Sequence, residues 1–143
     1  MSLNRVTLKQ AEKYAKAVIQ AKRVPYVAGS PGVGKSKMFE AIARQANLKM
    51  VDIRLAQEDP TTINGFPSLD GGRSKYLPPA LFPLKGDSLP VKEGMEAQYK
   101  QMVDAAQGDK TKLKQAVETC CYSGWLIFFD ELPSAPRSVQ AAA

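Results

Sequence analysis

Apolar residues recur at helical spacing in two segments of the first third of the chain. From residue 8 to residue 23 they occur every three or four positions, which predicts an amphipathic helix. Thr7 and Gln10 have the spacing of a capping box, which favours a helix start at this point. The same apolar spacing returns in residues 35–48 and predicts a second helix.

Short strand-like segments flank the second helix. Residues 24–28 form an apolar run, which predicts a strand. Residues 49–56 alternate between apolar and polar side chains, as a half-buried strand does. The order strand, helix, strand predicts a βαβ unit with a right-handed crossover.

Residues 57–90 have a different composition from the segments before them. Their many prolines and glycines exclude a long regular element. Within them, residues 66–77 predict a hairpin that turns at Asp70–Gly71. We expect a functional or partner-facing loop, because unstructured connections of this length are otherwise uncommon.

The last third of the chain returns to regular patterns. Residues 93–122 have helical spacing with a break at Gly108–Asp109. Residues 125–129 are all apolar, which predicts a strand buried on both faces. Asp130 and Glu131 follow at the carboxyl end of this strand, and a further helix is expected from about residue 137.

The overall composition is that of a folded globular domain and excludes several kinds of site. The chain has 143 residues, of which 44% are hydrophobic and 24% charged. It has no apolar run near the roughly 20 residues that cross a bilayer, and its polar start is unlike a signal peptide, so we expect a cytoplasmic protein without a membrane partner. Histidine is absent, and the only cysteines, Cys120 and Cys121, are adjacent. Ser-His-Asp and Cys-His catalysis are therefore excluded within this chain, and neither a disulfide framework nor a zinc site is supported.

The chain is basic, with 20 Lys and Arg against 14 Asp and Glu and a net charge of +6. The basic residues are scattered, which is typical of solvated helix faces. The charge is compatible with a nucleic-acid partner, but it favours one only weakly.

The stretch "GSPGVGKS", residues 29–36, matches the pattern of a phosphate-binding loop between a strand and a helix. Glycines allow such a loop to turn its backbone N–H groups inward, and the following helix adds its N-terminal N–H groups and dipole. Lys35 can reach the β and γ phosphates, and the Ser36 hydroxyl can coordinate Mg²⁺. The predicted nucleotide-binding residues are Gly29, Ser30, Pro31, Gly32, Val33, Gly34, Lys35 and Ser36.

The acidic pair in "LIFFDEL" supplies the groups that such a site would still need. Asp130 is placed to assist a magnesium ion, either directly or through water. Glu131 is placed to orient or deprotonate an attacking water molecule. With the loop upstream, this pair favours a nucleotide bound together with Mg²⁺ as the ligand.

Both motifs resemble segments of a known family. "GSPGVGKS" and "WLIFFDELPSAPRSVQ" are similar to the Walker A and Walker B segments of AAA+ ATPases. The tail "DELPSAPRSVQAAA" is most similar to the MoxR-like branch, including its phage and bacterial members. "DPTTINGF" and "YLPPALFP" resemble the segment that this branch carries before Walker B. The resemblance covers residues 24–83 and 125–143, and it leaves residues 84–124 as a family-specific insertion.

The resemblance implies a P-loop NTPase fold, a three-layer α/β/α arrangement with a mostly parallel sheet. Residues 1–143 would be the N-terminal part of the nucleotide-binding domain, with a loop-rich insertion at about 57–92 and a helical insertion at about 93–122. Residues 29–34 would contact the phosphates, and Ser36 and Asp130 would serve the metal. Lys35 would hold the β and γ phosphates during catalysis, and Glu131 would be the catalytic base.

The resemblance also implies partners and further parts. The family works as homo-oligomeric rings, usually hexamers, that remodel a protein or nucleoprotein client, and the hairpin around Asp70–Gly71, with Phe66 and Tyr76, is a candidate for client contact. Family sheets are similar in strand order, 5-1-4-3-2, so this chain would hold strands 1–3 only. The strand between the two motif strands, the sensor residues and the arginine finger are expected beyond Ala143. The chain alone is therefore expected to hydrolyse ATP slowly or not at all, since loss of an arginine finger costs about 10³–10⁵ in rate.

Two other interpretations stay open at this point. A P-loop kinase or transferase would use the same phosphate-binding loop, and its two motif strands are usually neighbours in the sheet. A nucleic-acid-binding module could use the nucleotide as a switch, in which case DNA binding would weaken steeply with salt.

Overall fold

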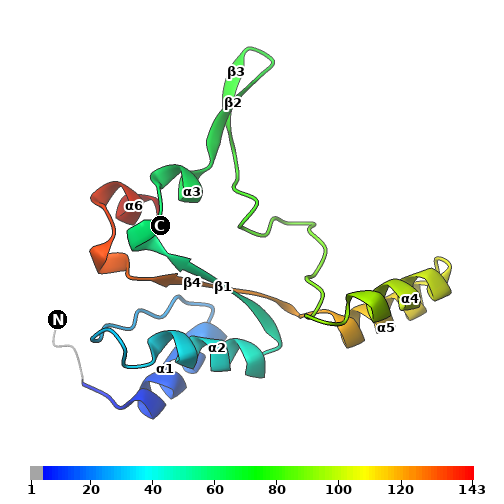
Figure 1. Cartoon of the computed structure of the whole chain (residues 1–143), viewed down its shortest axis with the longest axis horizontal. Helices are drawn as coiled ribbons and strands as arrows, with labels where there is room; N and C mark the ends of the chain where they lie inside the picture. Colours follow the sequence, from blue (N-terminus) through cyan, green and yellow to red (C-terminus); the bar gives the residue numbers. More distant parts are fainter. Residues whose placement is uncertain (1–4) are drawn as a thin grey trace.

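A small parallel sheet lies at the centre of the structure, a computed structural model that describes residues 5–143. Its strands are β1 (Leu48–Arg54) and β4 (Gly124–Asp130), paired in register from Leu48 beside Gly124 to Arg54 beside Asp130. Helices lie on both sides of these strands (Figure 1). The fold is therefore mixed α/β, and the carboxyl ends of both strands meet at one edge.

Two helices cover one face of the sheet, as the apolar spacing predicts. They are α1 (Leu8–Gln20) and α2 (Lys35–Gln45). The capping box at the start of α1 is present: the Gln10 N–H donates to Thr7 Oγ1 over 3.3 Å, and the Thr7 N–H donates to Gln10 Oε1 over 2.9 Å. The core on this face consists of Ala15, Met38, Phe39, Ile42 and Phe128.

Shorter elements cover the opposite face. They are η1 (Leu55–Gln57), α3 (Pro60–Asn64), η2 (Leu132–Ser134) and α6 (Arg137–Ala142). Their core consists of Ile53, Leu55, Ala135 and Val139, packed with Val51 and Phe129 among others. Because neighbouring strand residues point to opposite faces, β1 and β4 each contribute to both cores.

The predicted hairpin is present and projects away from the sheet (Figure 1). Its strands are β2 (Phe66–Asp70) and β3 (Arg73–Leu77), paired antiparallel. The turn residues are Gly71 and Gly72, both with positive φ, so the turn lies one position later than the predicted Asp70–Gly71. Positive φ at both central positions is what a type I′ hairpin turn requires, and glycine adopts it without strain.

The helical segment forms a second projecting unit, which extends to the right of the view, whereas the β2–β3 hairpin extends to the top (Figure 1). It consists of α4 (Glu96–Ala106) and α5 (Lys110–Cys120). The predicted break is confirmed: Gly108 has a φ of 86°, and Asp109 caps α5 by accepting from the Thr111 N–H. Cys120 and Cys121 are buried free thiols, so no disulfide joins them.

The predicted strand at residues 24–28 is wrong. The segment has no strand structure, and none of its backbone groups takes part in a backbone–backbone hydrogen bond within the described residues. A strand needs a paired neighbour, and here a cavity separates residues 24–28 from β4. Within residues 5–143 the sheet therefore holds two of the three expected strands.

The cavity between residues 24–28 and β4 also changes the burial of β4. Residues 125–129 do form a strand, but of this run only Phe128 is buried, and Ile127 is 38% exposed. The expected burial on both faces is therefore wrong, because one edge of β4 borders the cavity instead of another strand.

Candidate functional site

The glycine-rich corner leads from residues 24–28 into α2. Gly32 and Gly34 have φ values of 79° and 94°, in the left-handed region that glycine adopts without strain. Gly34 is the N-cap of α2, and no side chain caps this helix. The N–H groups of its first turn are therefore free of a side-chain acceptor, and the helix dipole adds partial positive charge. Such an N-terminus is suited to bind an anion.

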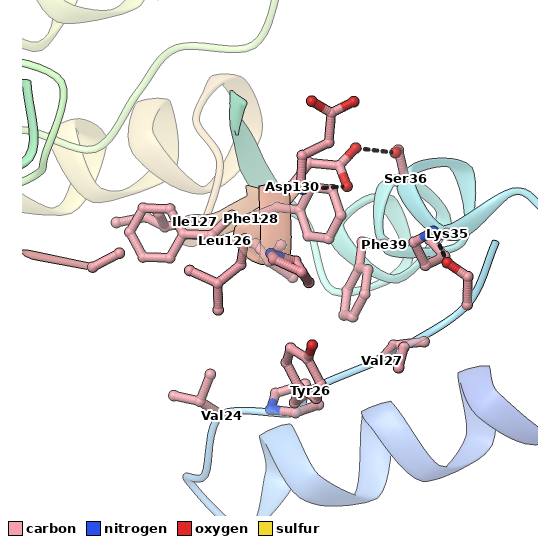
Figure 2. A pocket seen from close by; sticks show the side chains of 18 of the residues that line it. Val24, Tyr26, Val27, Lys35, Ser36, Phe39, Leu126, Ile127, Phe128 and Asp130 are labelled. Atoms are coloured by element: carbon pink, nitrogen blue, oxygen red, sulfur yellow. Dashed lines mark hydrogen bonds between the residues drawn. The ribbon is translucent and has the colours of Figure 1, made fainter. Parts of the chain in front are cut away.

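Lys35 folds back over this corner. Its Nζ donates to the carbonyl oxygen of Gly29 over 2.9 Å (Figure 2) and to that of Ser30 over 3.0 Å. The ammonium group thus lies at the mouth of the loop, held by neutral acceptors only. A phosphate oxygen would be a stronger acceptor for it than a carbonyl.

A hydrogen bond joins the corner to the acidic strand tip. Ser36 Oγ donates to Asp130 Oδ2 over 3.1 Å, although the two residues are 94 positions apart (Figure 2). The other carboxylate oxygen, Oδ1, accepts from the Glu131 N–H over 2.9 Å. A hydroxyl and a carboxylate are thereby fixed side by side next to the N-terminus of α2.

The donor set at this point suits Mg²⁺ only in part. Among residues 5–143 no cluster of three or more His, Cys, Asp or Glu side chains could hold a metal ion. Mg²⁺ usually keeps several waters and binds one or two carboxylates together with substrate phosphates. Ser36 and Asp130 fit that mode, in which a phosphate and water complete the coordination.

Asp52 adds a second carboxylate near Asp130. It lines a small pocket with Ser36, Lys37, Glu40 and Met50. Burial raises the pKa of Asp52, the negative charge of Asp130 raises it further, and Arg54 opposes the rise. The sequence pattern marks Asp52 only as a polar position of a strand, and its place beside the site follows from the pairing of β1 with β4.

Glu131 has a strained backbone. Its φ and ψ are 57° and 29°, the left-handed conformation, and its side chain is exposed. This conformation costs a non-glycine residue about 1–2 kcal/mol. Strain of this kind clusters at functional sites, where the rest of the structure holds it in place.

Replacing Glu131 with glycine should raise the free energy of unfolding by about 1 kcal/mol, because glycine adopts the left-handed conformation without strain. Denaturant unfolding measures this change. Gln107→Gly is the matched control, since Gln107 has a φ of 45° at the end of α4. It should stabilise the chain similarly and leave nucleotide binding unchanged. A loss of stability in Glu131→Gly would contradict the inferred strain.

A cavity of about 1120 Å³ connects the predicted site residues. Its polar end is formed by the corner and the strand tip, and its apolar part lies between residues 24–28 and β4 (Figure 2). Ser30 and Val33 are not among the lining residues. The predicted site residues that do line it are Gly29, Pro31, Gly32, Gly34, Lys35, Ser36, Asp130 and Glu131.

The geometry thus brings one loop, one helix start and one acidic strand tip to a shared cavity. Comparison of the chain with protein-family models, with curated proteins and with solved structures found no match. The functional interpretation therefore depends on the site itself.

In residues 5–143, no helix combines the length and the apolar character that a membrane crossing requires.

Proposed function

We propose that the chain binds MgATP at the corner formed by residues 29–36, as part of an ATPase of the AAA+ type. The observation that supports this most is the hydrogen bond between Ser36 Oγ and Asp130 Oδ2, 3.1 Å long. It joins the loop of residues 29–36 to the acidic strand tip, and a phosphate-bound magnesium ion would need both. The two segments are far apart in the sequence, so only the fold brings them together.

Each site residue has a role in this proposal. The free N–H groups at the start of α2 and the Lys35 ammonium bind the phosphates. Ser36 and Asp130 would coordinate the Mg²⁺ ion that the nucleotide carries. Bound Mg²⁺ would neutralise phosphate charge and polarise the terminal phosphoryl group. Glu131 orients or deprotonates the attacking water, and its exposed side chain next to Asp130 is compatible with this.

The sheet favours an ATPase over a P-loop kinase. In a kinase the strand before the loop is usually a neighbour of the acidic strand. Here residues 24–28 are separated from β4 by the cavity, and β4 pairs with β1 instead. The three-layer P-loop NTPase fold, the homo-oligomeric ring and the remodelled client are further parts of this proposal.

Nucleotide titrations of the wild type, Glu131→Gln and Asp130→Asn test the proposal. Wild type should bind ATP, and chelating Mg²⁺ should weaken the binding. Glu131→Gln should bind MgATP within about threefold of wild type, because the glutamate acts on water and not on the phosphates. Asp130→Asn should lose most of the benefit of Mg²⁺, since an amide is a poorer ligand than a carboxylate.

Calorimetry or a fluorescent ATP analogue gives these dissociation constants. Absence of ATP binding in the wild type, or binding that is the same with and without Mg²⁺, would contradict the proposed function. Binding that Glu131→Gln abolishes would contradict the role given to Glu131.

A further inference from the structure

Arg54 lies at the same edge of the sheet as the site. It is the last residue of β1 and pairs in register with Asp130, the last residue of β4. Paired residues of neighbouring strands lie about 4.8 Å apart and face the same side of the sheet. Arg54 therefore belongs to the face covered by α2, where Asp130 contacts Ser36.

The backbone of Arg54 is anchored on both sides. Ile53 and Leu55 are 2% and 0% exposed, and both belong to the core on the opposite face. Arg54 itself is exposed. Because its backbone is held by buried neighbours and its side chain is exposed, Arg54 can contact a ligand without a backbone rearrangement.

The guanidinium group is not committed to another partner. None of the ion pairs within residues 5–143 includes Arg54. It is close enough to Asp52 to lower the pKa of that carboxyl, against the effect of Asp130. The positive charge of Arg54 therefore acts on Asp52, which lines a small pocket together with Ser36 and Lys37 of α2.

We propose that Arg54 binds the terminal phosphate of the bound nucleoside triphosphate and so distinguishes a triphosphate from a diphosphate. The inference depends on the proposed function. The glycine corner faces β4 across the cavity, and β1, which ends at Arg54, pairs with β4 next to Asp130. In the proposed binding mode, a diphosphate held in the corner would end before the Ser36–Asp130 pair, and a third phosphate would extend toward the strand tips.

The chemistry of arginine suits this role. Its planar guanidinium group donates two parallel hydrogen bonds to phosphate oxygens, and it stays charged at any physiological pH. The competing explanation is that Arg54 only offsets the negative charges of Asp52 and Asp130. In that case it would affect every bound nucleotide alike.

The test is the ratio of dissociation constants for MgADP and MgATP in wild type, Arg54→Ala and Arg54→Lys. Arg54→Ala should weaken MgATP binding about tenfold, the effect of one charge-assisted hydrogen bond, and MgADP binding less than twofold. Arg54→Lys should recover part of the loss. Arg44→Ala is the matched control, because Arg44 lies in the last turn of α2 and pairs only with exposed Glu40.

The outcomes separate this inference from the proposed function. Equal weakening of both nucleotides by Arg54→Ala would overturn the inference, and so would no weakening, while MgATP binding by the wild type would stand. A wild type that binds neither nucleotide would overturn the proposed function and this inference together.

Discussion

Replacing Lys35 with alanine should weaken MgATP binding about 100-fold. In the structure Lys35 Nζ donates to two loop carbonyls, of Gly29 and Ser30, and phosphate oxygens would replace these acceptors on binding. Hydrogen bonds to charged groups contribute about 1.5–3 kcal/mol each, and 2.7 kcal/mol corresponds to about 100-fold in affinity. Calorimetric titration with MgATP measures the change.

The controls must show that a weaker affinity of Lys35→Ala comes from lost phosphate contacts and not from a disturbed loop structure. The free energy of unfolding of Lys35→Ala, measured without nucleotide, should stay within about 1 kcal/mol of wild type, because its two hydrogen bonds are exposed. Lys49→Ala removes an exposed lysine of β1 and should leave the affinity unchanged. Wild-type affinity in Lys35→Ala would contradict phosphate binding at this corner.

Replacing Phe128 with alanine should lower the free energy of unfolding by about 3–5 kcal/mol. Phe128 is 9% exposed and packs on Phe39 with 4.8 Å between ring centroids. The contact joins β4 to α2, so it also supports the approach of Asp130 to Ser36. The loss would be a large fraction of a typical total stability of about 5–15 kcal/mol.

Phe66→Ala is the matched control for Phe128. Phe66 lies on the β2–β3 hairpin and is 66% exposed, so its removal should change stability by less than about 0.5 kcal/mol. Urea unfolding followed by circular dichroism compares the two variants. Similar losses for both would show that the Phe39–Phe128 contact does not stabilise the sheet.

Much of the local structure could be predicted from the sequence. The capping box of Thr7, the break at Gly108 and the hairpin glycines act over a few residues, so their patterns are readable along the chain. The corner at Gly34 and the acidic strand tip were predictable for the same reason. Each of these features depends on backbone preferences and on the spacing of side chains.

The remaining features depend on contacts between distant residues. Residues 24–28 have the composition of a strand, yet they lack a paired neighbour within the described structure. Ile127 is exposed because it borders the cavity beside β4. The position of Arg54 beside Asp130 follows from the register of β1 and β4, which no local pattern specifies.

Amide NMR of the ¹⁵N-labelled chain during a MgATP titration can show whether the nucleotide binds at the corner of residues 29–36, because each resonance reports one residue. We expect the amides of Gly32, Gly34 and Lys35 to shift most, and we expect Lys35→Ala to lose these shifts at the same nucleotide concentration. Spectra that do not change with MgATP, or shifts confined to segments such as the β2–β3 hairpin, would contradict binding at this corner.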